Sequence, residues 1–163
     1  IGKKTTYLFS LRQSYLQLLF KLLGLPFLPN YIDGQVKFRI RLTERDELNF
    51  LGLTGIDNMK LNTSIKGESA EYMLSYLPQL KQETFTLGAT YRHFSSRGVQ
   101  SVSLSYSYLN NRNIKYRNND ASSAENLILR LRAVDGKAAL RADNRTYLGR
   151  WTLREGVEFT FRP

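Results

Sequence analysis

Apolar and polar residues alternate one by one along much of this chain. The run QVKFRIRL at residues 35–42 places Val36, Phe38, Ile40 and Leu42 on one side and polar or basic residues on the other. Because successive side chains of a strand point to opposite faces, this period of two predicts β-strands with one apolar and one polar face. The run SVSLSYSY at residues 101–108 repeats the pattern, with serine at every polar position.

The same period recurs in about eight segments, most of them about ten residues long. The predicted strands span residues 5–12, 35–42, 47–56, 84–94, 101–108, 126–133, 137–143 and 151–161. In the last of them, Glu155 falls on the apolar side and interrupts the pattern. A tilted transmembrane strand needs about ten residues, whereas strands of soluble sheets usually have ~5–6.

The segments between the predicted strands are short and long in turn. Short polar turns are expected at residues 43–46, 95–98 and 135–136. Long connections are expected at residues 13–31, 57–82 and 110–125, with a shorter one of the same kind at residues 144–150. This order puts every short turn at one end of the sheet and every long connection at the other, as in outer-membrane barrels. The predicted fold class is therefore all-β: a segment of an antiparallel up-and-down transmembrane β-barrel.

Other folds suit one-sided alternation as well. In a soluble β-sandwich, two apolar faces meet in a core. The net charge of +10 would then favour a soluble basic β-domain that binds polyanions, which needs basic and aromatic residues on one surface. About eight strands are also enough to close a small barrel, as in a free-standing porin or adhesin.

The most apolar segment, residues 14–31, lies in the first long connection. Its apolar run contains Gly24 and Pro26, and it is too short for a transmembrane helix, which needs ~20 apolar residues. We expect an ordered connector with a helical turn over residues 15–23 and an extended run that ends at Pro29.

Several strings resemble TonB-dependent outer-membrane receptors of the Bacteroidetes type and occur in that family's order. They are SYLQLLFKLLGLPFLPNYID at residues 14–33, ELNFLGLTGIDNMKLN at 47–62, YMLSYLPQ at 72–79, FTLGATYRHF at 85–94, YLNNRNIKYRNND at 108–120 and AENLILRLRA at 124–133. The resemblance implies a plugged barrel of about 22 strands that imports a nutrient, such as a metal chelate, glycan or peptide, across the bacterial outer membrane. By this resemblance, residues 1–163 are one unit, a partial β-barrel without the plug domain or the TonB box.

Two groups of polar residues are candidates for functional contacts. The connection at residues 110–123 is expected to be an external loop, and its candidate ligand contacts are Arg112, Lys115, Tyr116, Arg117, Asn119 and Asp120. A solvated loop held by Asn and Asp turns is the simpler interpretation of this group. The second group lies opposite the apolar positions and is expected to face the lumen: Lys37, Arg39, Arg41, Arg130, Arg132 and Arg154.

The chain offers few residues for catalysis or metal binding. It has no cysteine, and His93 is its only histidine, without a motif that supplies a nucleophile. We therefore expect neither an enzyme nor a cofactor nor a metal site. The expected partners are outer-membrane lipid, an unidentified ligand and, through the intact parent protein, TonB and the plug domain. Nucleic acid is not expected, because the basic residues are spread over many strands opposite the aromatic ones.

Overall fold

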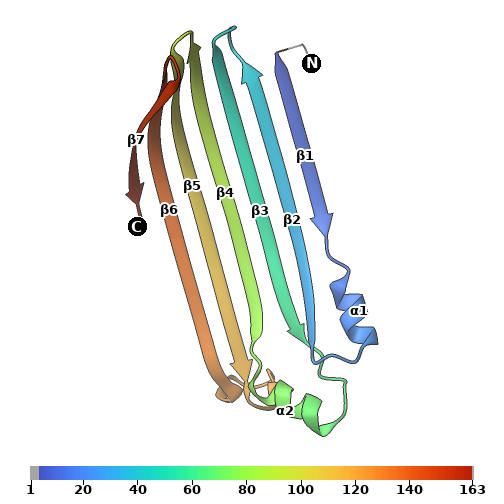
Figure 1. Ribbon diagram of the computed structural model, residues 1–163. Coiled ribbons are helices and arrows are strands. Elements are labelled where there is room, and N and C mark those ends of the chain that lie inside the picture. Colours follow the sequence, from blue (N-terminus) through green and yellow to red (C-terminus); the bar gives the residue numbers. More distant parts are fainter. Residues whose placement is uncertain (1–3, 163) are drawn as a thin grey trace.

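The computed structural model describes residues 4–162 as one antiparallel sheet (Figure 1). Its seven strands are β1 (Thr5–Gln13), β2 (Phe27–Arg41), β3 (Asp46–Leu61), β4 (Gln79–Ser95), β5 (Gly98–Tyr116), β6 (Leu127–Leu148) and β7 (Trp151–Phe161). Each strand pairs with the next one along the chain, so the sheet is a meander. Within the described residues, β1 and β7 do not pair with each other. The sheet is open, and the expectations of a small closed barrel and of a two-layer sandwich are both wrong.

Long and short connections lie at opposite ends of the sheet, as the sequence predicts. The long ones contain α1 (Leu16–Leu22), α2 (Glu68–Tyr76) and two 3-10 turns, η1 (Arg117–Asn119) and η2 (Ala124–Asn126). The short turns are residues 42–45, 96–97 and 149–150. In Figure 1 both helices lie at the lower end and the short turns at the upper end. We call these the long-loop end and the short-turn end.

The predicted turn at residues 135–136 is wrong, because β6 runs through it without a break. Gly136 pairs with Tyr108 in the middle of the β5–β6 ladder. The predicted strands 126–133 and 137–143 are therefore parts of one strand of 22 residues. The predicted long connection at residues 144–150 is also wrong, since only Gly149 and Arg150 separate β6 from β7. Gly149 adopts φ +63°, a left-handed conformation that glycine reaches without steric cost.

The first long connection is ordered as expected. The helical turn forms as α1, and the extended run begins at Phe27 and continues beyond Pro29 as β2. Ser14 N–H donates to Tyr31 O at 2.9 Å, and the Phe20 and Phe27 rings meet edge to face at 5.4 Å. Among the described residues, no helix is long and apolar enough to cross a bilayer.

One face of the sheet carries four consecutive rows of uncharged, mostly apolar side chains, and we call it the apolar face. A row consists of residues that the strand register places side by side on this face. From the long-loop end, the rows are Leu11, Gly34, Thr54, Phe85, Tyr108, Gly136; Phe9, Val36, Gly52, Leu87, Tyr106, Ala138, Phe161; Tyr7, Phe38, Phe50, Ala89, Leu104, Leu140, Phe159; and Thr5, Ile40, Leu48, Tyr91, Val102, Ala142, Val157.

The opposite face, which we call the polar face, differs at the same level of the strands. Its centre carries Thr86, Thr90, Ser103, Ser105 and Ser107, which alternate with apolar residues of β4 and β5. Thr86 bonds to Ser107 and Thr90 to Ser103 across these strands, each at 3.0 Å. Hydroxyl groups therefore satisfy one another on this face.

The sheet leaves its apolar face uncovered. In the described chain, Leu74 is the only large apolar side chain that is buried, whereas Leu104, Phe9 and Phe159 are 59%, 72% and 67% exposed. The accessible surface is 12151 Å², compared with about 8,300 Å² for a compact monomer of this mass. The apolar residues do not form a core of their own, so they need an apolar medium or partner.

Candidate functional site

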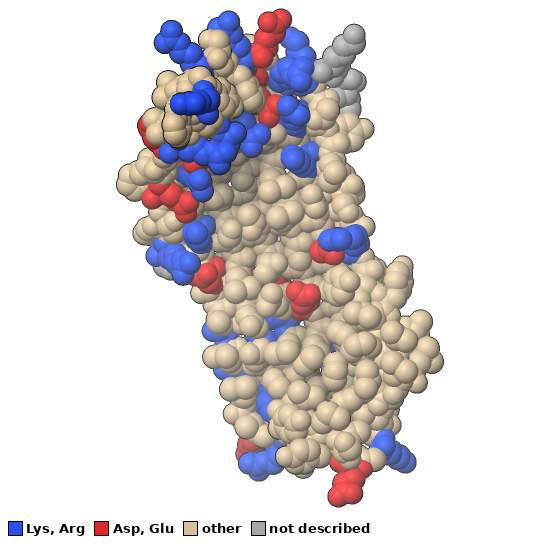
Figure 2. Space-filling view, in the orientation of Figure 1, with Lys and Arg blue, Asp and Glu red and all other residues tan. Residues whose placement is uncertain are grey.

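Charged side chains gather at the short-turn end of the molecule, at the top of Figure 2. A pocket of about 900 Å³ opens there beside β4, β5, β6 and β7. Its charged lining residues are Arg92, Arg141, Asp143, Arg145, Arg154, Glu155 and Glu158. The strand register brings these residues together from segments that the sequence alone assigns to separate strands and a loop.

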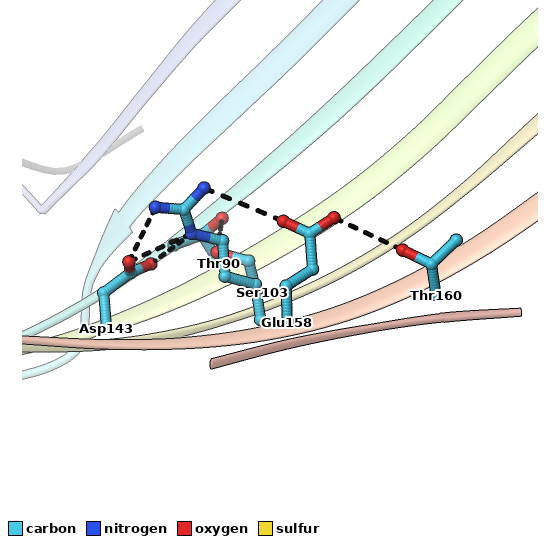
Figure 3. Close-up of polar contacts among 6 residues, drawn as sticks. Thr90, Ser103, Asp143, Glu158 and Thr160 are labelled. Atoms are coloured by element: carbon cyan, nitrogen blue, oxygen red, sulfur yellow. Dashed lines mark hydrogen bonds and ion pairs between the residues drawn. The ribbon is translucent and has the colours of Figure 1, made fainter. Parts of the chain in front are cut away.

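Arg141 is held by two carboxylates. Its guanidinium donates to Asp143 at 2.7–3.0 Å, and its Nη1 lies 3.8 Å from Glu158 Oε2. Thr160 Oγ1 donates to the other oxygen of Glu158 at 3.3 Å. Figure 3 shows Asp143, Glu158 and Thr160 along the edge formed by β6 and β7. The charge of Arg141 is thus neutralised within the sheet, and this residue is fixed in position.

Glu47 forms a second ion-pair cluster on the polar face. Its side chain is 4% exposed, accepts hydrogen bonds from Arg39 and Asn49, and lies 3.5 Å from Arg92 Nη1. One carboxylate of β3 therefore links arginines of β2 and β4. Because an unpaired buried carboxylate is costly, these arginines are tied to the fold rather than free for a ligand.

Arg145 and Arg154 are different, because neither forms an ion pair among the described residues. They are directly opposite each other in the β6–β7 ladder and both line the pocket. Like charges at directly opposed positions destabilise a sheet. An anionic group between the two guanidinium groups would relieve this repulsion. The pocket can therefore accept a carboxylate or phosphate at Arg145 and Arg154.

The predicted external loop is shorter than expected. Arg112, Lys115 and Tyr116 belong to β5, and only Arg117, Asn119 and Asp120 lie in the connection.

Several of these residues are engaged inside the protein. Lys115 is 6% exposed, and its Nζ donates to Leu74 O and to Asn119 Oδ1, both at 2.6 Å. Asn119 Nδ2 also donates to Leu74 O at 3.1 Å. These bonds fasten the connection to α2, so Lys115 and Asn119 have a structural role. Arg117 is exposed.

Asp120 closes a turn in the same connection. It accepts hydrogen bonds from Ser122 N–H at 2.9 Å and from Asn126 Nδ2 at 3.0 Å. The bonds from Ser122, followed by the one from Asn126, lower the pKa of the Asp120 carboxyl from its ordinary value. This is the turn chemistry of the simpler interpretation of the loop.

The six basic residues expected on one face do not all share it. Lys37, Arg39, Arg41 and Arg154 lie on the polar face, as expected. Arg130 and Arg132 lie on the apolar face, beyond its four rows, because their positions on β6 have the same parity as Ala138 and Leu140. Arg132 Nε accordingly donates to Asn110 Oδ1 at 3.2 Å, and Asn110 lies on the same face as Tyr108.

His93 contacts an acidic residue that the sequence analysis did not single out. Its Nδ1 lies 2.8 Å from Asp46 Oδ1, and Asp46 also accepts hydrogen bonds from Tyr91, at 2.6 Å, and from Thr43. The cluster joins β3 to β4 beside the turn at residues 42–45. Within residues 4–162, no group of three or more acidic or histidine side chains is placed to hold a metal ion.

Sequence reasoning missed Asp46, Glu47, Arg141, Asp143 and Glu158. Two strings carried a signal for the first four of these residues. RDE at residues 45–47 adjoins opposite charges beside a turn, and RADNR at residues 141–145 alternates opposite charges along one side of a strand. Comparisons with protein-family models, curated proteins and solved structures found no match to this chain.

Proposed function

We propose that this chain is a wall segment of a TonB-dependent outer-membrane receptor of the Bacteroidetes type. The proposal combines the resemblance of the six strings with the chemistry of the two faces. In the intact receptor, a ligand such as a metal chelate, glycan or peptide would bind the external loops and the plug. TonB would then remodel the plug to open a path. This segment would contribute lipid-facing rows, charges that line the passage, and external loops.

The observation that carries the proposal is the uncharged band on the apolar face. Four rows at about 6.6 Å per row extend about 26 Å along the strands. A strand tilt of roughly 40° reduces the height of the band to about 20 Å, close to the ~25 Å apolar band of outer-membrane barrels. The next row toward the short-turn end contains Asp46, His93, Gln100, Asn144 and Glu155. The band therefore ends in polar residues, as the border of a bilayer requires.

The two edges of the sheet support an extended wall. Among the described residues, β1 pairs only with β2, and β7 only with β6. Unpaired backbone groups are very costly in hydrocarbon, so a bilayer segment needs partners on both edges. We propose that further strands of the same barrel supply them.

The basic residues give less support to a soluble polyanion-binding domain. They divide between the two faces, and several of those on the polar face are already paired with carboxylates. A polyanion-binding surface needs free basic residues gathered on one side.

A tryptophan placed on each face tests the proposal. Trp151 is the only tryptophan, so W151F/F159W puts a single tryptophan on the apolar face and W151F/T160W puts it on the polar face of the same strand. The chain is folded into maltoside micelles, and its fluorescence is compared in plain and brominated detergent. We expect several-fold stronger quenching for F159W, because bromine quenches only on contact. Equal quenching at both positions, or a monomeric chain that stays folded without detergent, would contradict the proposal.

A further inference from the structure

Three cations lie in one straight row on the apolar face, beyond its uncharged band. In the strand register, Lys81 of β4 lies directly opposite Arg112 of β5, and Arg112 lies directly opposite Arg132 of β6. Arg130 follows two residues away on β6, on the same face and farther from the band. We call these four residues the cation row. Directly opposed like charges destabilise a sheet, so this arrangement requires compensation.

The protein supplies only part of that compensation. Glu83 Oε1 lies 2.7 Å from Lys81 Nζ, and Glu83 Oε2 lies 3.9 Å from Arg112 Nη2. Asn110 relays this contact, since it donates to Glu83 at 2.8 Å and accepts from Arg132 at 3.2 Å. Thus one carboxylate compensates two cations directly and a third through Asn110, and no contact of this cluster reaches Arg130.

The cations keep unused capacity for an acceptor. Arg130 forms no ion pair among the described residues and is exposed, so its guanidinium is open to an acceptor. The side chains of Lys81 and Arg112 are 45% and 42% exposed. An external anion can therefore reach the row, and arginine forks bind phosphate oxygens in pairs.

The position of the row indicates which anion it meets. The aromatic pair Phe85 and Tyr108, with ring centroids 5.2 Å apart, belongs to the last row of the uncharged band. The cation row lies two rows farther along the strands, about 13 Å, or about 10 Å in height when the strands tilt. The headgroup layer of a bilayer extends about 5–8 Å beyond each border of the hydrocarbon. The apolar band of outer-membrane barrels is a few Å taller than the four rows, so that border lies slightly beyond the last row, and the cation row falls within the headgroup layer.

We propose that the cation row binds the phosphate-bearing headgroups of lipids in the leaflet nearest the long-loop end. The inference rests on the proposed function, since it needs the apolar face to contact lipid. It adds a lipid-binding site to the outer wall of the segment. The sequence pattern had instead predicted that Arg130 and Arg132 face the lumen.

The test compares two triple variants that lose the same charge. K81Q/R130Q/R132Q removes three cations of the row but keeps Arg112, whose Nε is buried. K37Q/R41Q/K137Q removes three cations from the polar face. Binding of the full chain is measured by flotation with vesicles of phosphatidylcholine alone and with about one phosphatidylglycerol per four phosphatidylcholines.

We expect the unmodified chain to bind the anionic vesicles at least about tenfold more tightly than the neutral ones. K81Q/R130Q/R132Q should lose most of this preference and keep its binding to neutral vesicles, whereas K37Q/R41Q/K137Q should keep both. Circular dichroism of each variant in micelles verifies that the sheet is retained.

The remaining outcomes separate the two proposals. If the unmodified chain binds neutral vesicles without preferring anionic ones, or if both triple variants lose the preference equally, the lipid site is wrong and the proposed function stands. If soluble glycerol phosphate abolishes the preference at equal ionic strength, the row binds free phosphate and the lipid assignment is wrong. If the unmodified chain binds neither kind of vesicle, the proposed function fails and the lipid site with it.

Discussion

Leu104 and Ser105 are neighbours on β5, yet they lie in different chemical surroundings. Leu104 belongs to the third apolar row, between Ala89 and Leu140. Ser105 lies on the polar face, between Gly88 and Ala139. In a compact protein, Leu104 would be buried and Ser105 exposed, but here Leu104 is 59% exposed and Ser105 is the less accessible of the two.

The comparison shows that the two faces differ in chemistry although both are open. Under the proposed function, the apolar face contacts lipid and the polar face contacts water. A sheet surrounded by water would normally bury its apolar side under a second layer, and residues 4–162 form only one layer. The most direct way to test the difference is to place the same charge at both positions.

Leu104→Arg and Ser105→Arg should therefore have unequal effects. An arginine at the centre of a lipid-facing band costs about 2–4 kcal/mol of folding free energy. We expect a loss of about 3 kcal/mol for Leu104→Arg and less than about 1 kcal/mol for Ser105→Arg, because the small neighbours of Ser105 leave space on a polar surface. Urea titration in micelles, followed by circular dichroism, measures both. Equal losses would show that the two faces meet the same medium.

The ion pairs of the polar face give the next largest effect. Glu47→Gln removes the charge that Arg39 and Arg92 share, and its side chain is almost fully buried. Breaking a buried pair costs about 3–5 kcal/mol, but both arginines are about half exposed, so we expect about 2 kcal/mol. Glu158→Gln is the control, because Glu158 is 45% exposed and lies 3.8 Å from Arg141. It should lose less than about 0.5 kcal/mol. If Glu158→Gln lost more unfolding free energy than Glu47→Gln, the ion pair between β6 and β7 would be the more stabilising one.

Strands with one apolar and one polar face, their antiparallel order, and the long-loop and short-turn ends of the sheet could be predicted from the sequence. Each of these features depends on a local pattern of residues. It fails on β6, where the apolar residues change parity at Gly136. Residues 129 and 131 are apolar on one face, and residues 138 and 140 on the other. A change of parity is typical of a strand break or bulge, so two strands were predicted. Here it marks the place where a single strand leaves the uncharged band.

Register with neighbouring strands supplies what the local pattern lacks. Glu155, which interrupts the alternation of β7, pairs with Asn144 in the polar row just outside the band. Arg130 and Arg132 lie beyond the opposite border of the band for the same reason. Inside the band, every second residue along a strand is uncharged and lies on the apolar face, so the sequence alone predicts the face of each residue. Beyond it, polar residues occupy both faces, and only the pairing determines which face carries a given charge.

At the long-loop end, the buried charge of Lys115 stabilises the connection between β5 and β6 instead of facing lipid or water. Lys115→Met removes the two hydrogen bonds from Nζ to Leu74 O and Asn119 Oδ1. We expect a loss of about 1 kcal/mol, since Asn119 still bonds to Leu74 O. Amide exchange should become faster in α2 and stay unchanged in the β4–β5 ladder. Arg117→Met, at an exposed position of the same connection, is the control and should change neither. Unchanged exchange in α2 for Lys115→Met would show that the connection is not held by this lysine.

The smallest expected effect concerns the exposed Asp120, which lies outside both faces. Hydrogen bonds from Ser122 and Asn126 lower its pKa, so the folded protein favours the carboxylate. The resulting stabilisation is fully present above the unfolded pKa of ~3.9 and is lost as the pH falls through the lower folded value. We expect the carboxyl carbon of Asp120 to titrate below the ordinary aspartate pKa of ~3.9, as measured by NMR. In the unmodified protein, protonation of Asp120 weakens its bond from Ser122 N–H, so exchange of this amide hydrogen should become faster as the pH falls. In Asp120→Asn, which has no carboxyl group at this position, this acceleration should be absent. A carboxyl that titrates at its ordinary pKa would mean that the turn is open in solution, and Asp120 would then be free for a ligand.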